Sequence, residues 1–504
     1  MISKTSILRG RRARTAVAAA ATPLLLSACT VGPDFDRPAP LASQHYDRQA
    51  EQQLAGGGGT TGAQQISLAK TVEGDWWSAF RSPKLDQVMR KAIAGNLDLA
   101  AADATLARAD EAVAAVRGGL RPQVDFGAAG GRQRAVNGDV LATSSFYAVG
   151  PTVSFDFDVF GGTKRRVEAQ AALAELEKHR FDAAWLTLTG DVASQALLLG
   201  SARAQIDAVQ ALLADDRKTL ELVRTGHLHG SATQVDVALA EAQLAQDETL
   251  LPPLAQQRDT ARHALSILAG KGPADWTAPD FDLSDFALPS DLPVSLPSEV
   301  AHDRPDILEA EAQLHAASAG IGVATADLYP HLELSGALAE AGPGIGALWG
   351  VAAGLAGPIY RGGTLEADRR AAVDGYKAAL AGYQQTVVRS LGQVADLLQA
   401  IHHDAEECAA QARALSAAEA SLRLNRDGYR VGEIDVLQVL DAERVYQHAL
   451  IGQIRAKTAQ YLDTVQLSIA LGGNSSGAFE RRAALRDETS SVAPAAVERP
   501  PSLR

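Results

Sequence analysis

The sequence repeats one unusual pattern twice, and this repeat restricts what the chain can fold into. In each copy, two short segments of alternating apolar and small or polar residues precede a glycine pair, Gly161–Gly162 or Gly362–Gly363, and a long helical pattern follows. Neither long stretch, 163–251 or 361–473, contains proline. Because order, spacing and end signals agree at an offset of about two hundred residues, we interpret the pattern as an internal duplication.

The alternating segments predict strands with one apolar and one polar face. Apolar residues occupy every second position in Tyr147–Phe160 and again in Val351–Ile359. A run of about ten such residues fits a half-buried strand and has the length of a tilted strand that crosses a bilayer. Upstream partners, Val124–Gly130 and His331–Leu338, complete a strand pair in each copy.

The segments after the glycine pairs predict helices much longer than a globular core needs. We expect Thr163 and Thr364 to cap these helices, and glycine turns near 226–230 and 428–432 to end their first arms. Each first arm then runs for about sixty residues, or roughly 90–100 Å. An apolar seam for a neighbouring helix comprises Leu391, Val394, Leu397, Leu398 and Ile401.

Two strand pairs give four strands per chain, and four strands cannot close a sheet on themselves. An open edge that faces lipid leaves backbone groups unpaired at several kcal/mol each, so the strands must pair with further copies. A barrel of about eight strands is filled by its own side chains, whereas about twelve strands leave a lumen. A conduit therefore favours a trimer.

The first residues predict export and lipid attachment. Lys4 and several arginines precede an apolar run over Ala16–Leu26, which is too short for a permanent membrane helix. The run ends in Leu26–Cys29, and small residues before a cysteine resemble the lipobox of bacterial lipoproteins, in which the cysteine becomes the acylated N-terminus. The alternative is an ordinary signal peptide with a chance cysteine. Thr30 stands where an inner-membrane retention signal would have Asp, which favours the outer membrane.

Composition and spacing argue against nucleic-acid binding and catalysis. The formal net charge is −13, and no basic stripe with interleaved aromatics occurs. His402 and His403 are adjacent and should point about 100° apart on a helix, so we expect that they cannot face one metal. His227 and His229 lack ligands at zinc spacing. We predict no enzyme activity, no metal and no cofactor except the covalent lipid on Cys29.

Three motifs give a family resemblance over nearly the whole mature chain. They are Cys29–Phe35 after the lipobox, Asp75–Phe80 before the first helix and Arg304–Ile307 at the start of the second copy. With the glycine pairs, they resemble the TolC-like outer-membrane efflux family, in its lipoprotein branch of NodT and OprM type. Two of these motifs also have a structural explanation: Trp76 and Trp77 would anchor a packed subdomain, and Arg304 and Asp306 would form a cap and a salt bridge.

The resemblance implies an α+β fold that is mostly α. Three copies would form a twelve-stranded transmembrane β-barrel, with four strands per chain, that continues into a long periplasmic α-helical barrel. The implied location is the outer membrane, with the lipid anchor and the strands both in contact with outer-membrane lipid. The implied partners are a periplasmic adaptor protein and an inner-membrane transporter, often of the RND type.

The resemblance also places a gate at the periplasmic ends of the helical pairs. Asp441 matches the position of a lumen-facing acidic ring, and Tyr429 matches a constricting tyrosine. Gln438 departs from a position that is often acidic, so the gate should carry less negative charge unless Asp435 compensates. Asp236 matches a position that hydrogen-bonds the tip tyrosine of the other hairpin. The alternative for Asp435 and Asp441 is a solvated helix face near a turn.

The predicted organisation has six parts. They are a lipoprotein signal peptide (1–28), a lipidated tether (29–72), a first repeat (73–270, with strands near 123–131 and 146–160 and helices over 163–270), a connector (271–303), a second repeat (304–473, with strands near 331–341 and 347–360 and helices over 364–471) and a disordered tail (474–504). The predicted function is a passive exit duct for small molecules. The alternatives are a duct for type I protein secretion and a non-conducting scaffold lipoprotein, and only the scaffold predicts no membrane strands.

Overall fold

The computed structural model divides the chain into two compact units. Unit 1 comprises residues 1–38, 105–178 and 309–385, and unit 2 comprises residues 39–104, 179–308 and 386–504. Each unit therefore combines segments of both repeats. The structure describes residues 30–39, 45–49, 51, 64–70, 75–137, 140–342, 346–473, 477–478 and 481–482. The predicted signal peptide and Cys29 lie outside the described residues.

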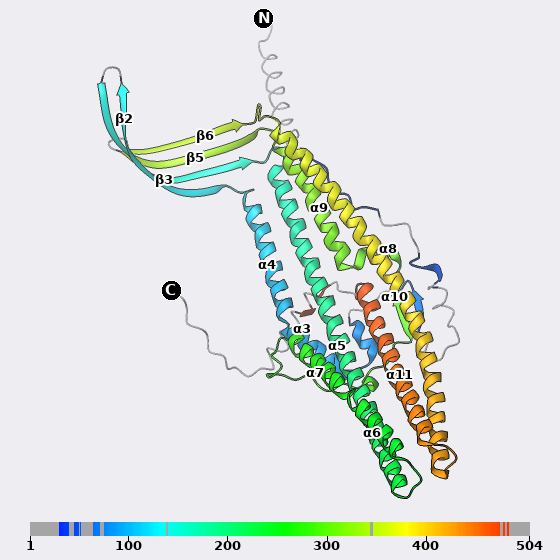
Figure 1. Ribbon diagram of the computed structural model, residues 1–504. Helices are drawn as coiled ribbons and strands as arrows, with labels where there is room; N and C mark the ends of the chain where they lie inside the picture. The colour runs from blue at the N-terminus through cyan, green and yellow to red at the C-terminus, as the bar shows by residue number, and fades with distance from the viewer. Residues whose placement is uncertain are drawn as a thin grey trace. The chain divides into compact units, whose positions relative to one another are not determined.

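Unit 1 contains a four-stranded antiparallel sheet of order β2-β3-β5-β6, which Figure 1 shows as four strands lying side by side. Its strands are β2 (Gln123–Asn137), β3 (Val140–Phe157), β5 (His331–Gly342) and β6 (Gly346–Ala356). β3 and β5 join the two repeats, with pairs such as Thr152↔Ala337. The described strands leave the outer edges of β2 and β6 unpaired.

The strand ends differ from the expected ones. β2 continues to Asn137, beyond the expected end near 131, and β3 begins at Val140, before the expected start near 146. β6 ends at Ala356, before the expected end near 360. Pro358 explains this early end, since it has no N–H group for a ladder hydrogen bond. The loop over 343–345 lies outside the described residues.

The two long helices are α5 (Gly162–Leu228) and α10 (Thr364–Val431), with 67 and 68 residues. At 1.5 Å per residue each is about 100 Å long, as the sequence predicts. The return arms differ between the repeats: the first is divided into α6 (Gln234–Glu248) and α7 (Leu251–Leu268), whereas the second is one helix, α11 (Val436–Ala470). We call α5–α6 hairpin 1 and α10–α11 hairpin 2. No helix within the described ranges is both long enough and apolar enough to span a membrane.

The start of α5 is capped by Asp158, which precedes the helix in the chain. The carboxylate of Asp158 accepts hydrogen bonds from the backbone N–H groups of Thr163 and Lys164, both at 2.8 Å. The expected cap by Thr163 is therefore wrong, because a carboxylate satisfies two helix-terminal N–H groups and also favours the positive end of the helix. Among the described residues, no hydrogen bond of the Thr364 hydroxyl caps α10 either.

Two helices follow η1 (Trp76–Phe80) in the chain, α3 (Pro83–Gly95) and α4 (Leu97–Gly118). Ser82 caps α3 by accepting from the N–H of Leu85 at 3.4 Å. Asn96 interrupts the helix with an extended backbone, and its Oδ1 accepts from the N–H of Leu99 at 2.8 Å. The amide side chain therefore ends one helix and caps the next.

Unit 2 has an aromatic core next to the short helix η1 (Trp76–Phe80). Trp76 and Trp77 are about 5% exposed, and their rings meet edge to face with centroids 6.0 Å apart. Val394, Leu398 and Ile401 of α10 are fully buried in the same core. The packing interpretation of the tryptophan pair and the apolar seam on α10 are both confirmed.

Residues of the expected tether and connector also enter unit 2. Strand β1 (Gln65–Leu68) pairs in parallel with β4 (Asp291–Val294). The remaining connector elements are η2 (Leu283–Asp285) and α8 (Pro297–Asp303), and α9 (Pro305–Ala326) begins the second repeat. The last part of the predicted tether (29–72) therefore includes a paired strand, β1.

The predicted disordered tail is wrong for its first described residues. Arg482 is 2% exposed, and its guanidinium donates to the backbone oxygen of Leu99 at 2.5 Å. The guanidinium also lies 3.5 Å from the carboxylate of Asp103. The ordered chain thus reaches beyond 473, and residues 483–504 lie outside the described residues.

The residues that follow Cys29 are held in unit 1. The N–H of Val31 donates to the backbone oxygen of Phe160 at 3.0 Å. Arg165, whose side chain is 4% exposed, donates to the backbone oxygen of Val31 at 3.1 Å and pairs with Asp34 and Glu168 at 2.8 and 2.7 Å. The motif after the lipobox therefore binds at the start of α5.

Candidate functional site

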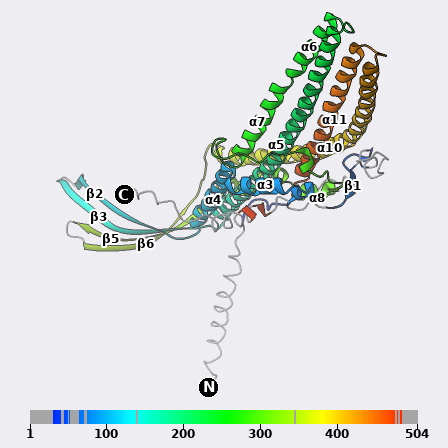
Figure 2. The ribbon, with the colours of Figure 1, turned by 90° about the horizontal axis from the view of Figure 1, so that it is seen from below.

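The turns of the two hairpins lie near each other in unit 2, and both line a cavity of about 910 Å³. Figure 2 shows hairpins 1 and 2 side by side and reaching the same end of the unit. Hairpin 1 contributes Gly226, Ser231 and Asp236 to the lining, and hairpin 2 contributes Tyr429 and Gln438. Segments about two hundred residues apart in sequence thus form one site, which we call the tip cavity.

An apolar cluster joins the hairpins beside the tip cavity. Its buried members come from α5, α6 and α11, and they are Leu220, Val223, Val237, Ala240, Val436 and Leu440. Tyr429 packs against this cluster and is partly buried. Burial raises the pKa of Tyr429, and the negative charge of Asp236 raises it further. The phenol therefore stays neutral at physiological pH.

Asp236 has a different hydrogen-bond partner from the one that the resemblance implies. Its carboxylate accepts from the N–H and the hydroxyl of Thr233, at 2.7 and 2.8 Å, and Thr233 Oγ1 accepts from the N–H of Asp236 at 3.2 Å. These bonds form a capping box, and the backbone hydrogen bond from Thr233 lowers the pKa of Asp236. Among the described residues, no hydrogen bond joins Asp236 to Tyr429. The Asp236 carboxylate is held in the capping box at the start of α6. It therefore affects Tyr429 through its negative charge.

The other acidic residues of the tip have local partners as well. Asp435 is the N-cap of α11 and accepts from the N–H of Gln438 at 3.1 Å. Asp441 is exposed and pairs with Arg444, one turn along the helix, at 3.0 Å. Within one chain, the charge of Asp441 is therefore partly offset by Arg444, and Asp435 serves the helix end.

Sequence reasoning missed a polar network below the tip cavity. Arg426 of α10 contacts Asp215 of α5 and Glu443 of α11, and Asp216 and Asp247 lie buried nearby. The duplication offered a signal for this network, because Arg224 and Glu241 of hairpin 1 recur as Arg426 and Glu443 of hairpin 2.

The two tip histidines of hairpin 1 make structural contacts. His227 Nδ1 lies 3.1 Å from the backbone oxygen of Ala232, and His229 Nδ1 lies 2.9 Å from that of Thr225. Both imidazoles therefore help to fix the turn between α5 and α6.

Adjacent His402 and His403 approach one carboxylate, contrary to expectation. Their ring nitrogens lie 3.7 and 3.5 Å from the two carboxylate oxygens of Glu406. One possible ligand atom of each residue lies within 4.8 Å of the others, so the argument that these histidines cannot face one point is wrong. The angle of about 100° applies to the Cα–Cβ directions, whereas the side chains turn toward Glu406. His403 and Glu406 are exposed, and carboxylate–imidazole pairing accounts for this approach.

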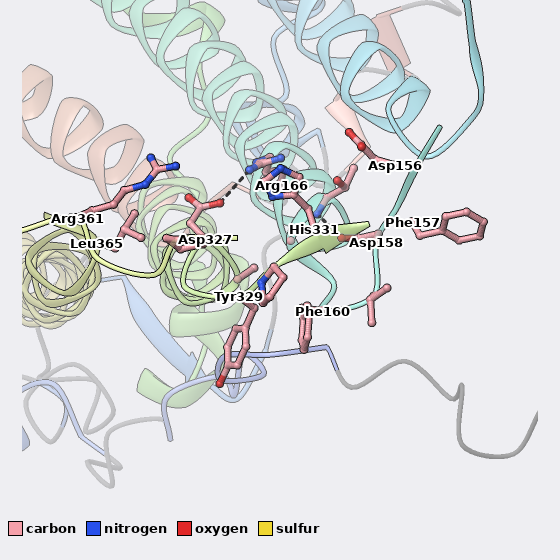
Figure 3. Close-up of a pocket in the computed structure, with 16 residues that line it drawn as sticks. Asp156, Phe157, Asp158, Phe160, Arg166, Asp327, Tyr329, His331, Arg361 and Leu365 are labelled. Carbon is pink, nitrogen blue, oxygen red and sulfur yellow. Dashed lines mark hydrogen bonds and ion pairs between the residues drawn. The ribbon is translucent and has the colours of Figure 1, made fainter. Parts of the chain in front are cut away.

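A second cavity, of about 420 Å³, lies in unit 1 where the strands meet the helices (Figure 3). Three of its charged side chains have partners: Asp158 caps α5, and Arg166 pairs with Asp327 at 3.2 Å. Phe160 and Tyr329 stack with their centroids 4.6 Å apart. These contacts give the cavity a structural role at the ends of the strands.

Known proteins share this architecture. The family model described as "Outer membrane efflux protein" matches residues 88–271 and 296–473. The pyoverdine export outer membrane protein OpmQ of Pseudomonas putida is 31% identical over 79% of this chain and 87% of its own length. The outer-membrane channel OprN is 27% identical, with a TM-score of 0.81 over 88% of this chain and 99% of that chain. The open state of the Neisseria gonorrhoeae MtrE outer membrane channel is 26% identical, with a TM-score of 0.78 over 88% of this chain and 98% of that chain. The chain belongs to the outer membrane efflux protein family.

Proposed function

We propose that this protein is the outer-membrane exit channel of a tripartite efflux system and acts as a homotrimer. The observation that carries the proposal is the combination of an open four-stranded sheet with two hairpins whose first helices are about 100 Å long. The unpaired edges of β2 and β6 require partners, and further copies supply them. Family membership supports the same role.

The proposed partners are a periplasmic adaptor and an inner-membrane transporter of the RND type. The cargo is a small molecule that the transporter selects, and the channel conducts it passively without catalysis. The relative named for pyoverdine export and the relatives named for cation efflux support small cargo over secreted proteins. Heat-resistant trimers and single-channel conductance in planar bilayers test the proposal, and monomers without conductance would favour a scaffold instead.

We also propose that Cys29 carries a covalent lipid. The attachment of Val31 to Phe160 and Arg165 supports an anchor at the start of α5. Cys29→Ser is expected to abolish incorporation of labelled palmitate, while trimers and conductance remain. The control is Cys408→Ser, which should keep the label, because Cys408 is half-buried on α10 and burial raises the pKa of its thiol to about 11. Label retained by Cys29→Ser, or lost from Cys408→Ser, would contradict the proposal.

The tip cavity is proposed as the periplasmic gate. Asp236→Ala removes the capping box at a cost of about 1 kcal/mol, and Tyr429→Ala removes packing from the apolar cluster. Both changes are expected to loosen the closed tip and to increase conductance and antibiotic uptake. Tyr429→Phe keeps the packing and should resemble wild type. Unchanged conductance and uptake in Asp236→Ala and Tyr429→Ala would show that the gate lies elsewhere.

A further inference from the structure

Arg426 joins the two hairpins below the tip cavity. Its Nη1 lies 2.9 Å from Asp215 Oδ2 of hairpin 1, and its Nη2 lies 3.0 Å from Glu443 Oε1 of hairpin 2. The same oxygen of Glu443 accepts from the hydroxyl of Thr219, on hairpin 1, at 3.1 Å. The Glu443 side chain is only 1% exposed, whereas Arg426 and Asp215 are 31% and 37% exposed, so the carboxylate of Glu443 is the buried charge of this network.

Hairpin 1 contains the counterpart of this pair. Arg224 and Glu241 each precede Arg426 and Glu443 by 202 residues, the offset of the duplication. Their side chains lie 2.6 Å apart but are 57% and 48% exposed. An exposed pair within one hairpin contributes little to stability, whereas removing one member of a buried pair leaves an uncompensated charge. The duplication therefore supplies a matched internal control.

Two further carboxyl groups lie beside the network. Asp216 of α5 and Asp247 of α6 are each 3% exposed, and among the described residues neither carboxylate oxygen of Asp216 has a hydrogen-bond partner. Burial, followed by the charges of Asp247 and Glu443, raises the pKa of Asp216 to about 8. A buried carboxyl group that accepts no hydrogen bond favours its neutral, protonated form.

The charged and polar groups around Asp216 come from all the neighbouring helices. On α5 they are Asp215, which also pairs with Lys218 at 3.1 Å, and Thr219. The other helices contribute Asp247 with Gln243 on α6, Arg426 on α10 and Glu443 on α11. Arg426 is the cation that bridges the two hairpins in this group. When Asp216 loses its proton, one more negative charge enters a site that already holds three carboxyl groups.

We propose that Arg426 is a positioning residue of the gate, which holds hairpin 2 against hairpin 1 in the closed tip, and that a proton on the buried Asp216 keeps this contact intact. The proposal rests on the proposed channel function and adds a regulatory property to it. Below a pH of about 8 Asp216 is neutral and the tip stays closed. As the pH rises through that value, repulsion among Asp215, Asp216 and Glu443 favours opening.

The first test is single-channel recording on purified trimers at about pH 7 and about pH 9.5. Arg426→Ala is expected to open about tenfold more often than wild type at neutral pH, with partial rescue by Arg426→Lys. The matched control, Arg224→Ala, should behave as wild type. Asp216→Asn imitates the protonated acid, so it should close normally at neutral pH and lose the opening at alkaline pH. Equal opening of Arg426→Ala and Arg224→Ala, or alkaline opening that persists in Asp216→Asn, would overturn the proposal.

A second test does not depend on conduction. Spin labels at Leu228 and Glu433, which are exposed at the two turns, report the distance between the hairpins in a Cys408→Ser background. Wild type should give a narrow distribution at neutral pH and a broader one in alkali, and Arg426→Ala a broad one at both. A narrow distribution in Arg426→Ala refutes the positioning role even if the protein conducts. If Arg426→Ala gives a broad distribution but neither wild type nor any variant conducts, the positioning role is supported. Only the proposed channel function is then contradicted.

Discussion

Replacing Gly270 with alanine is expected to destabilise the protein by about 4 kcal/mol or more and to abolish heat-resistant trimers. Gly270 has a φ of +69°, and a Cβ atom there would lie 2.0 Å from the backbone oxygen of Gly95. Gly95 itself lies close to the backbone oxygen of Ala269. The side-chain amide of Asn96 donates to the backbone oxygen of Leu268 at 3.0 Å. The ends of α3 and α7 thus touch backbone to backbone, with no side chain between them that could move aside.

The control for this change is Gly272→Ala. A Cβ atom at Gly272 would meet only the carboxylate of Asp275, which can rotate away, and its φ is not positive. Circular-dichroism melting and gel analysis of outer-membrane fractions should therefore separate the two variants clearly. Normal trimers and a normal melting temperature in Gly270→Ala would contradict the close contact.

Arg304→Ala is expected to cost about 3 kcal/mol, the second largest effect. The Arg304 guanidinium binds both carboxylate oxygens of Asp306 at 3.0 and 2.8 Å, and it also donates to the backbone oxygen of Ala470 at 2.5 Å and to Gln393 at 3.1 Å. It therefore ties the start of α9 to α10 and to the end of α11. The expected salt bridge of the Arg304–Ile307 motif is confirmed, and the structure adds the link between helices.

The cost of Arg304→Ala should depend on pH. Burial raises the pKa of Asp306, but the hydrogen bonds and charge of Arg304 outweigh burial and hold this pKa below its usual value. A depressed carboxyl pKa contributes stability that is present above the unfolded-state pKa and is lost as pH falls through the folded-state pKa. Melting experiments should therefore show a large difference between variant and wild type at neutral pH and a smaller one in acid.

The control for Arg304→Ala is Lys377→Ala. Lys377 and Asp374 form an exposed pair at 2.9 Å, and this change should alter stability by at most about 0.5 kcal/mol. Equal melting temperatures for the two variants would mean that the Arg304 contacts contribute no more than a surface pair.

Features set by periodicity were predictable from the sequence. The alternation around Val153 and Val351 predicts strands, and the seam at Val394 and Leu398 predicts a buried helix face. Element ends were less predictable, because they depend on remote or single contacts. Asp158 caps α5 from outside the helix, and Arg482 reaches the backbone of Leu99 across most of the chain. Neither contact leaves a periodic signal.

The candidate gate was predictable in place but not in detail. The glycine turns and the family match bring Asp236 and Tyr429 to one cavity, as found. The capping box of Asp236 could have been read from Thr233 three residues earlier, since this spacing is typical of a helix start. Arg426 required the structure, because the burial of its partner Glu443 and its contact with Asp215 distinguish it from Arg224.

The sheet edges have a genetic consequence. Among the described strands, the free edges belong to two different strands, β2 and β6. A contact between copies therefore joins unlike surfaces, and a closed ring needs both edges of every copy. One damaged edge therefore interrupts the whole assembly of three. In a cell that makes damaged and intact chains equally, only about one trimer in eight contains three intact copies. Edge mutations in this gene would then be dominant over the wild-type allele.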